Sequence, residues 1–373
     1  MLNVKFRNSL SVFIILLATF KYYASFMGIN YLSKFVMLIS LAVSAVLIST
    51  DYKKYNFLHI LILIFAIIQF IISKNITLIY VYFISLGLYT GDFRCLLKWF
   101  IIINSTFFTI FLLCNLLSIY PTVYIEGRND FGFGNPNSAF ICFFLVWSSY
   151  FCYNFNSKKR VDFFVLAVSV LLMYTQTITR TGLISAISTA IAFFILKKVD
   201  VFKPRVAYFL AAFPLVMSIL SLMIAIFGKD AYYLNNFLSH RPLYWNSYLT
   251  HTTNGLNFFG YIPNIRDVLF SQRMPLDSGY IWTLYSMGVL SFILLIFIQC
   301  YTIYILCIEN QKDKVLLIIS VLIYSFAESI LVDIASNISI ILLVYGISKF
   351  DIKSISLNKM KLQRPKKFRK KIG

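Results

Sequence analysis

Charged side chains are scarce in this sequence. Asp, Glu, Lys and Arg make up only 13% of the 373 residues, whereas 60% are hydrophobic. A soluble domain of this length could not hide so many apolar side chains, which excludes a water-soluble globular protein. Many apolar runs approach the roughly 20 residues that a helix needs to cross a bilayer. The sequence therefore predicts an all-α, polytopic membrane protein.

Metal-ligand and redox spacings are also missing. The six cysteines lie in or beside apolar runs, and none has a C-x-x-C or metal-ligand spacing. We interpret them as small buried apolar side chains. No soluble domain and no internal repeat is evident, so we expect a single transmembrane domain over residues 1–350.

Apolar runs separated by short polar breaks predict about twelve spans. No A-x-A-like cleavage site follows the first run, which favours an uncleaved helix over a signal peptide. Very short connections join the third run to the fourth and the seventh to the eighth, and they predict two tight helical hairpins. The expected spans are near residues 9–27, 32–50, 57–73, 76–90, 95–119, 138–154, 162–178, 182–196, 206–227, 279–307, 314–333 and 337–350.

The basic residues predict the orientation of these spans. A net charge of +20 would suggest a nucleic-acid partner in a soluble protein, but here the basic residues mostly lie in short loops. With the N-terminus inside, 25 of the 34 lysines and arginines fall on the inner side, as the positive-inside rule requires. We therefore expect both termini in the cytoplasm, no nucleic-acid partner, and a basic cytoplasmic tail at 351–373 lying on anionic lipid.

One polar interruption, residues 228–278, is far longer than the others. It falls between the ninth and tenth spans, so it is predicted to form one large extracytoplasmic loop. Lysine and arginine should be depleted on that side, yet five arginines are expected there. They are Arg128, Arg180, Arg241, Arg266 and Arg273. For Arg266 and Arg273, a solvated loop charge is an equally open interpretation.

Arg128 lies in a turn-rich stretch that runs from Gly127 to Asn137. Asn135 or Asn137 can cap a helix there, with Pro136 in its first turn. Free N–H groups and the positive end of that helix would form an anion site, which Arg128 would strengthen. The alternative is a capped helix start after a turn, with nothing bound.

Arg180 lies among threonines at the turn of the second predicted hairpin. A charge so close to the hydrocarbon is costly without a partner. An anion ligand is the favoured interpretation, and a structural role in bridging loop carbonyls is the alternative.

Arg241 and Pro242 predict the start of a short helix in the large loop. Tyr244 and Tyr248 share one face of that helix, and Trp245 lies on the next. Such a helix could lie in the membrane interface with its rings buried.

In this order, the motifs resemble those of Wzy-type polysaccharide polymerases and of the related O-antigen ligases. The resemblance covers roughly residues 30–350. The motifs are Gly-Arg-Asn-Asp-Phe-Gly-Phe-Gly-Asn-Pro-Asn (127–137), Thr-Arg-Thr-Gly (179–182), Arg-Pro-Leu-Tyr-Trp (241–245), Gly-Leu-Asn-Phe-Phe-Gly (255–260) and Asp-Ser-Gly-Tyr-Ile (277–281), with Gly288 downstream. Ligases typically carry a His-Asn-like pair where this chain has Asp277 and Ser278, which favours a polymerase.

The resemblance implies a membrane glycosyltransferase with a GT-C-like helical fold. Its substrates would be undecaprenyl-diphosphate-linked oligosaccharides at the outer face of the bacterial plasma membrane, in capsule, exopolysaccharide or O-antigen biosynthesis. It would need neither a cofactor nor a metal. Membrane lipids, a flippase and a chain-length regulator are the other expected partners.

A diphosphate leaving group accounts for the outer arginines in this reading. Arg128, Arg180 and Arg241 would neutralise the charge that develops as the sugar–phosphate bond breaks, aided by the helix start at Asn135 and Asn137. A base must accept the proton of the attacking hydroxyl. The first candidate is Asp277 and the second is His240, although a lone loop histidine is more often solvent-exposed than catalytic. Three aromatic rings could stack on sugars or seat the lipid, namely Tyr244, Trp245 and Tyr248.

Two other classes of function are compatible with the sequence. A transporter, such as a flippase of lipid-linked oligosaccharides, usually carries charges near the membrane midplane and repeated halves. Here most central spans are free of charge, and Glu328 and Asp333 are interpreted as snorkelling or loop-facing residues near span ends. A non-catalytic scaffold would leave the outer arginines unexplained.

Overall fold

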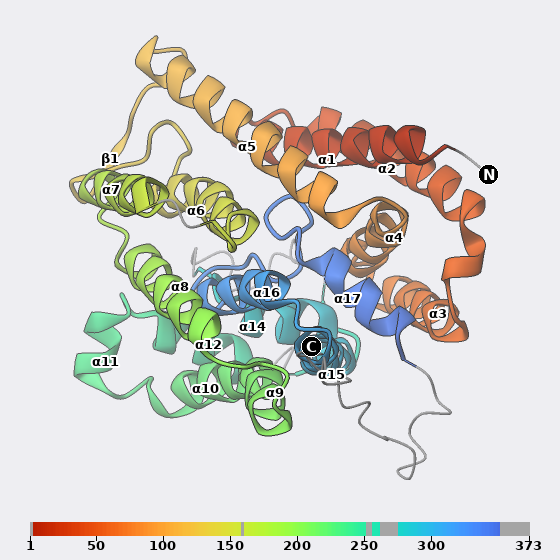
Figure 1. The fold of residues 1–373 in the computed structure, drawn as a ribbon. Helices are drawn as coiled ribbons and strands as arrows, with labels where there is room; N and C mark the ends of the chain where they lie inside the picture. Colours follow the sequence, from red (N-terminus) through yellow and green to blue (C-terminus); the bar gives the residue numbers. More distant parts are fainter. Residues whose placement is uncertain (1–2, 158–159, 251–255, 262–274, 351–373) are drawn as a thin grey trace, which may run out of the picture.

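The computed structural model describes residues 3–157, 160–250, 256–261 and 275–350. Within these ranges the chain is helical apart from one two-stranded hairpin and its loops (Figure 1). The elements are α1 (Val4–Phe26), α2 (Asn30–Thr50), η1 (Tyr52–Lys54), α3 (Phe57–Ser73), α4 (Thr77–Tyr89), α5 (Phe93–Leu116), β1 (Tyr124–Ile125), β2 (Arg128–Asn129), α6 (Pro136–Tyr153), α7 (Arg160–Thr177), α8 (Arg180–Lys198), α9 (Pro204–Ala211), α10 (Phe213–Phe227), α11 (Tyr232–Phe237), α12 (Arg241–Thr250), α14 (Gly279–Trp282), the π-helical turn η2 (Thr283–Met287), α15 (Gly288–Ile308), α16 (Lys312–Tyr324) and α17 (Ile340–Ser348).

The helices are compatible with a multi-pass membrane protein. Among the described residues, six helical stretches are long and apolar enough to cross a membrane, whereas about twelve spans were expected from the sequence. Shorter apolar helices account for part of the difference. The two helical hairpins predicted from short connections are present as α3–α4 and α7–α8. The six stretches are Val4–Phe26, Tyr31–Thr50, Phe93–Leu116, Arg180–Lys198, Pro204–Phe227 and Gly279–Ile308.

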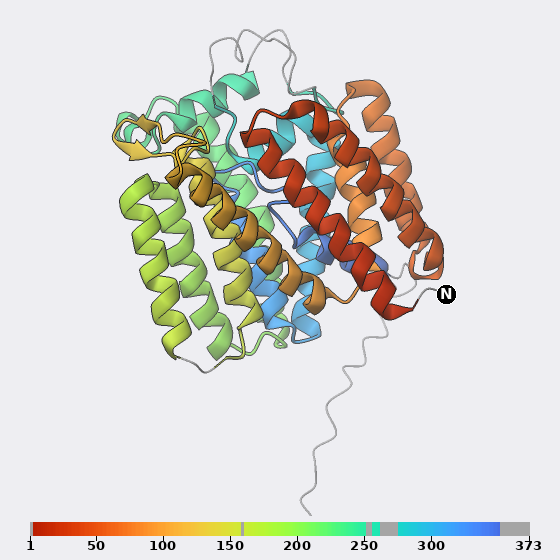
Figure 2. The same cartoon turned by 90° about the horizontal axis from the view of Figure 1, so that it is seen from above.

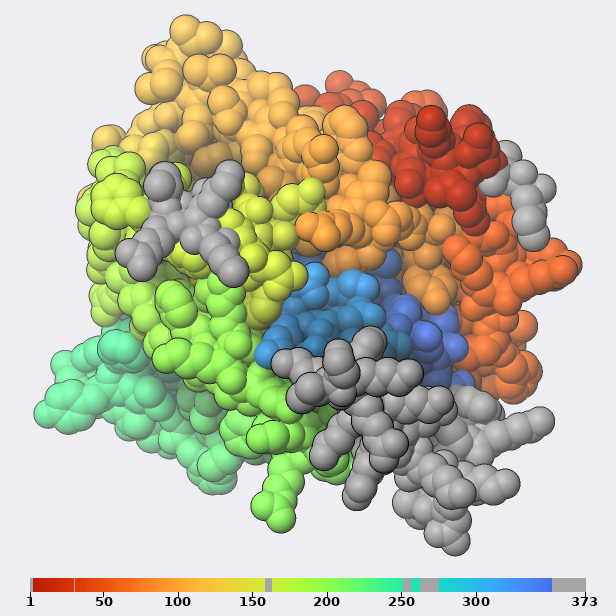
Figure 3. Space-filling view, viewed as in Figure 1, coloured from red at the N-terminus to blue at the C-terminus, as the bar shows by residue number. Residues whose placement is uncertain are grey.

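The C-terminal helices form the centre of the molecule. In Figures 1 and 3, α16 and α17 (blue) lie between the N-terminal helices (red and orange) and the middle helices (green). Every residue from Val315 to Leu322 is buried, as is nearly all of α17. Because the core is built here, side chains carried by this part of the chain are removed from the molecular surface.

The sequence-based expectation of two complete spans at 314–333 and 337–350 is wrong. α16 ends at Tyr324, α17 begins only at Ile340, and the chain between them, which we call segment 325–339, contains no α-helix. Irregular backbone at membrane depth is tolerated where it is buried in protein. In segment 325–339, polar side chains make hydrogen bonds with backbone groups that helical hydrogen bonds would otherwise satisfy. One of them is Asn337, whose side-chain amide donates to the carbonyl of Leu331 at 2.9 Å.

Two of the six membrane-length stretches contain a local break in the α-helix. The run at 206–227 divides into α9 and α10, with Pro214 in the first turn of α10. The run at 279–307 begins with the short α14 and the π-helical turn η2, and only then continues as α15. Hydropathy does not register such breaks because the residues on both sides remain apolar.

The connections between helices gather on two opposite faces. We call one the terminal face; it contains the start of α1, the connections at 51–56, 90–92 and 309–311, and the end of α17. The opposite loop face contains the β1–β2 hairpin, α11 and α12. In Figure 2 the N-terminus lies at the lower right, and α11 and α12 (teal) lie at the upper edge.

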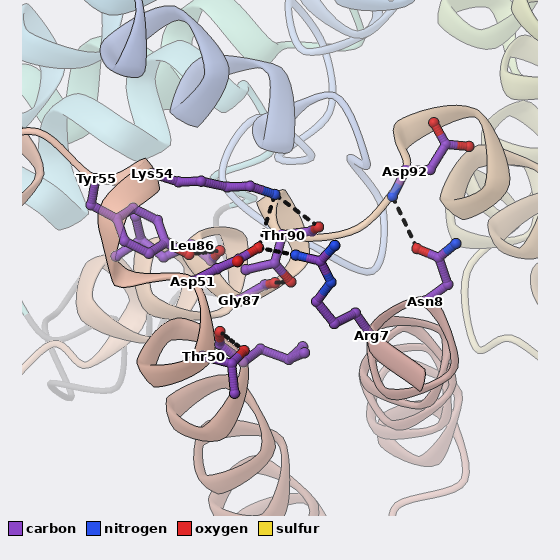
Figure 4. A network of polar contacts seen from close by, with 11 residues as sticks. Arg7, Asn8, Thr50, Asp51, Lys54, Tyr55, Leu86, Gly87, Thr90 and Asp92 are labelled. Atoms are coloured by element: carbon purple, nitrogen blue, oxygen red, sulfur yellow. Dashed lines mark hydrogen bonds and ion pairs between the residues drawn. The ribbon is translucent and has the colours of Figure 1, made fainter. Parts of the chain in front are cut away.

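A polar network closes the terminal face around the first helix (Figure 4). Arg7 of α1 forms an ion pair with Asp51, which also pairs with Lys54 at 3.0 Å. Lys54 in turn donates to the carbonyl of Thr90 at 3.2 Å. Burial raises the pKa of Asp51, but Lys54 and Arg7 outweigh this effect and hold that pKa below its usual range. The network therefore joins the ends of α1, α2 and α4.

Candidate functional site

A buried arginine joins three parts of the loop face. The guanidinium of Arg241, at the start of α12, pairs through Nε with Asp277 Oδ2 at 2.9 Å. Its Nη2 pairs with Glu328 Oε1 at 3.0 Å, and its Nη1 donates to the carbonyl of Ala327 at 2.8 Å. We call Arg241, Asp277 and Glu328 the Arg241 cluster. It holds α12 and the end of the large loop against segment 325–339.

Asp277 is engaged through both carboxylate oxygens. Oδ2 faces Arg241, and Oδ1 accepts a hydrogen bond from Trp245 Nε1 at 3.2 Å. Burial lowers the pKa of Arg241, but Glu328 and then Asp277 outweigh this effect and raise it above its usual value, so the guanidinium stays charged. With both oxygens engaged, the Asp277 carboxylate anchors the loop to Arg241 and Trp245. This geometry suits a structural role better than the role of the base expected from the sequence.

Glu328 departs from the sequence interpretation. We expected it near the end of a span, snorkelling or facing a loop, but its side chain is 5% exposed and paired with Arg241. The available signal was an acidic residue within an apolar run, which by default marks a functional or paired position. What the sequence could not supply was the partner, which lies 87 residues earlier in the chain.

The other predicted residues of this loop occupy different environments. Trp245 and Tyr248 are fully buried, and Tyr248 packs against Tyr285 with ring centroids 5.2 Å apart. Tyr244 is partly exposed, and His240 is exposed with a φ of 60°. In this conformation, of the three proposed sugar- or lipid-contacting rings, only Tyr244 has a surface that a substrate could reach.

The loop before α6 is organised by Asp130, which sequence reasoning did not single out. Its side chain is buried and accepts backbone hydrogen bonds from Val123, Gly132 and Gly134 at 2.8–3.1 Å. The loop then ends at Asn135. Of the two asparagines that the sequence offered as caps, Asn135 is the N-cap of α6, because its side chain accepts the N–H of residue 137 at 2.8 Å and Pro136 follows in the first turn.

Two helix N-termini lie side by side on the loop face. Gly182, in the first turn of α8, packs directly against the ring of Phe140 of α6, and a Cβ at position 182 would overlap that ring. Arg180 is the first residue of α8 and is exposed. Arg128, on β2, pairs with Glu126 at 3.6 Å and retains 26% side-chain exposure. The positive ends of both helices and the Arg180 charge are therefore brought together.

An apolar groove of about 530 Å³ begins beside this point. Thr181 lines it at the loop-face end and Leu196 at the other, a distance of about 22 Å along α8 at 1.5 Å per residue. Helices α9, α10, α11 and α16 complete the walls, and nearly all of the lining is apolar. Ala327, whose carbonyl holds Arg241, lines it as well. The groove therefore connects the Arg180 region to the Arg241 cluster.

The predicted site residues form two groups. Arg180 and Asn137 lie at the paired helix starts, with the Arg128 hairpin beside α7, whereas Arg241 and Asp277 form the buried cluster. Arg266, Arg273 and Gly255 lie outside the described residues. In the described part of the chain, no three His, Cys, Asp or Glu side chains gather as metal ligands.

Comparison with protein-family models, with curated proteins and with solved structures finds no match to this chain.

Proposed function

We propose that this protein is a membrane glycosyltransferase that joins lipid-diphosphate-linked oligosaccharide repeat units. It acts as a polysaccharide polymerase on the outer side of a bacterial plasma membrane, with both termini in the cytoplasm. The undecaprenyl diphosphate carrier is the expected donor lipid. An O-antigen ligase-type transfer to another acceptor uses the same donor chemistry.

One observation carries the proposal: the paired helix starts above the apolar groove. Each helix N-terminus carries about half a positive charge, so α6, α8 and Arg180 together present about two charges. A diphosphate needs this combination of guanidinium and backbone N–H donors. The groove along α8 accepts the start of an isoprenoid chain, because its wall is nearly all apolar. An amphipathic donor lipid matches both parts.

The Arg241 cluster has a supporting role in this proposal. Its guanidinium already faces two carboxylates, so it adds no net positive charge for a diphosphate. It fixes the carbonyl of Ala327 at the groove wall and anchors α12 at its rim. Arg180, for which no carboxylate partner is found among the described residues, therefore replaces Arg241 as the foremost anion ligand.

A transporter of lipid-linked oligosaccharide is the second candidate. Segment 325–339 interrupts two buried helices, and discontinuous helices are common at transporter binding sites. A flippase would move lipid-linked units across vesicle membranes without changing their length, whereas a polymerase lengthens them on one side.

The test compares two exposed arginines, Arg180 and Arg205. Each lies in the first turn of a helix, but the two helices begin on opposite faces of the molecule. Arg180→Ala should weaken binding of undecaprenyl diphosphate by about 10- to 100-fold, which is the range for a hydrogen bond to a charged group. Polymer formation from purified lipid-linked units should fall with it. Binding is measured on the full-length protein in nanodiscs.

Arg205→Ala is the matched control, because Arg205 is an exposed residue in the first turn of α9 and lies near the terminal face. It should bind the lipid as the wild type does. Equal binding by Arg180→Ala and wild type would remove the paired helix starts as the diphosphate site. A wild type that neither binds nor elongates lipid-linked units would refute the proposed function itself.

A further inference from the structure

A polar cavity lies apart from the Arg241 cluster and the apolar groove. It has a volume of about 260 Å³ and lies among α1, α2, α4 and segment 325–339. This is slightly below the roughly 300–1,000 Å³ of pockets for drug-sized ligands, so it suits a ligand of about one sugar ring. The polar side chains that line it are Lys21, Tyr22, Ser25, Ser33, Tyr80 and Asp333.

The cavity lies near the loop face. α1 starts on the terminal face, so Lys21, five residues before its end, lies about 8 Å below the loop-face end of that helix. Ser33 is in the first turn of α2, and Tyr80 is the fourth residue of α4. A ligand attached to a lipid headgroup could reach this depth from the loop face.

Two oppositely charged groups line the cavity without pairing with each other. In the described ranges, no ion pair includes Lys21 or Asp333. The Lys21 ammonium lies over the ring of Tyr80, 4.8 Å from its centroid. The Asp333 carboxylate accepts hydrogen bonds from the backbone N–H of Ala335 at 3.3 Å and the hydroxyl of Ser336 at 2.8 Å. These bonds fix the carboxylate, which has room to accept further donors.

This set of groups matches the chemistry of a saccharide. A sugar presents hydroxyls, which donate to a carboxylate and accept from an ammonium, and C–H faces, which pack on aromatic rings. Carboxylate, ammonium, hydroxyl and phenol groups are all present around one small cavity.

A single helix, α6, lies between the cavity and the start of α8 in the proposed diphosphate site. Tyr22 and Tyr23 of α1 pack with Cys142 of α6, whereas Phe140 of α6 packs against Gly182 of α8. Packed helices have axes about 8–10 Å apart. The two sites therefore lie on either side of the first turns of α6, close enough for two parts of one reacting pair.

Segment 325–339 also links the cavity to the Arg241 cluster. It supplies Glu328 to the cluster and Asp333 to the cavity, and five residues of chain span about 18 Å at most. Ion pairing of Glu328 with Arg241 therefore helps to fix the backbone that carries Asp333.

We propose that the Lys21–Asp333 cavity binds the terminal sugar of the acceptor and that Asp333 is the base that activates its hydroxyl. The hydroxyl oxygen forms a bond to the anomeric carbon of the donor sugar, and the bond from that carbon to the diphosphate oxygen breaks. The electron pair leaves with the diphosphate, and the hydroxyl proton passes to the Asp333 carboxylate. This inference rests on the proposed function and assigns the base that Asp277 and His240 leave open.

The experiment separates acceptor chemistry from donor binding. Asp333→Asn keeps the size of the side chain and an oxygen acceptor, and it should lower kcat by about 10²–10⁴-fold, as expected for a lost general base. Its affinity for undecaprenyl diphosphate should equal that of the wild type.

Ser33→Leu fills the cavity without changing a charge and should raise the KM for the acceptor with donor affinity unchanged. Binding of the lipid-free repeat-unit oligosaccharide to purified protein should weaken in Ser33→Leu.

Asp230→Asn is the matched control, because Asp230 is an exposed carboxylate that follows α10 near the loop face. It should leave kcat and both affinities unchanged. Wild-type kcat in Asp333→Asn, or wild-type oligosaccharide binding in Ser33→Leu, would overturn the inference while the proposed function stands. If the wild type neither binds undecaprenyl diphosphate nor elongates lipid-linked units, the proposed function fails, and the cavity assignment as an acceptor site fails with it.

Discussion

At the residue scale, the guanidinium of Arg241 makes three buried polar contacts at the loop face. It faces two carboxylates and a carbonyl, and its side chain is only 7% exposed. A buried charge is tolerated when its hydrogen bonds are made, and removing one member leaves the others unpaired. Stability and activity should therefore respond differently to substitutions in this cluster.

The loss of stability on substitution in the cluster should depend on which charged groups are left without a partner. Arg241→Met leaves two carboxylates without their cation and should lower the free energy of unfolding by about 3–5 kcal/mol. Asp277→Asn leaves Arg241 with Glu328 and should cost only about 1–3 kcal/mol. Melting curves of the purified protein in detergent give the order of the two variants.

Turnover per folded molecule decides the role of Asp277. The structure leads us to expect near-normal turnover in Asp277→Asn, since both of its oxygens already serve Arg241 and Trp245. An unchanged melting temperature with turnover lost by about 10²-fold or more would instead identify Asp277 as the base.

At the element scale, Gly260 and Gly288 allow the middle of the large loop, at residues 257–261, to pack against η2 and the start of α15. The N–H of Tyr261 donates to the carbonyl of Ser286 at 3.1 Å, and that of Val289 donates to Asn257 at 3.0 Å. Gly288 has a φ of 88°, and a Cβ there would collide with the backbone of residues 258 and 260. Residues 257–260 of the sequence motif and the downstream Gly288 are therefore one packing unit.

Gly288→Ala should disrupt this unit. Positive φ costs a side chain about 1–3 kcal/mol, and here the new methyl group also meets backbone that cannot move aside. Gly127→Ala is the matched control, because Gly127 has a φ of 76° but nothing within 4 Å of an added Cβ. Melting temperatures of both variants are compared with wild type. Equal shifts would show that backbone conformation alone matters and that the contact with residues 258–260 adds nothing.

At the scale of the whole molecule, the two faces differ in what they carry. The terminal face joins segments that are distant in the sequence through contacts such as Arg7 with Asp51 and Lys349 with Glu309. The loop face carries Arg180, the Arg241 cluster and the Lys21–Asp333 cavity. All proposed chemistry therefore opens on one side of the molecule.

Labelling of single added cysteines tests which side that is. Tyr233 of α11 is 87% exposed on the loop face, and Lys53 is exposed on the terminal face. Tyr233→Cys should react with a membrane-impermeant maleimide in intact cells, and Lys53→Cys only after permeabilisation. The unmodified protein, with its six free cysteines, gives the background. The reverse pattern would place the proposed sites in the cytoplasm and contradict the charge-based orientation.

The sequence by itself determined the helical, membrane-type character and the two tight hairpins, and it narrowed the cap of α6 to Asn135 or Asn137. These depend on local properties: apolar run length, connection length, and an Asn-Pro pair whose side chain bonds residue 137. It also indicated that Arg128, Arg180 and Arg241 stand out, since arginine is unusual on the side where charge counting places them.

Only the tertiary structure decided what these residues contact. Hydropathy read residues 314–333 as one span, because unwinding depends on buried partners for the backbone and not on the apolar content of the run. Arg241 meets Glu328 across 87 residues, and the cavity gathers residues from α1, α2, α4 and segment 325–339. Such contacts are set by the packing of distant helices, and no local pattern in the chain encodes which distant charges will meet.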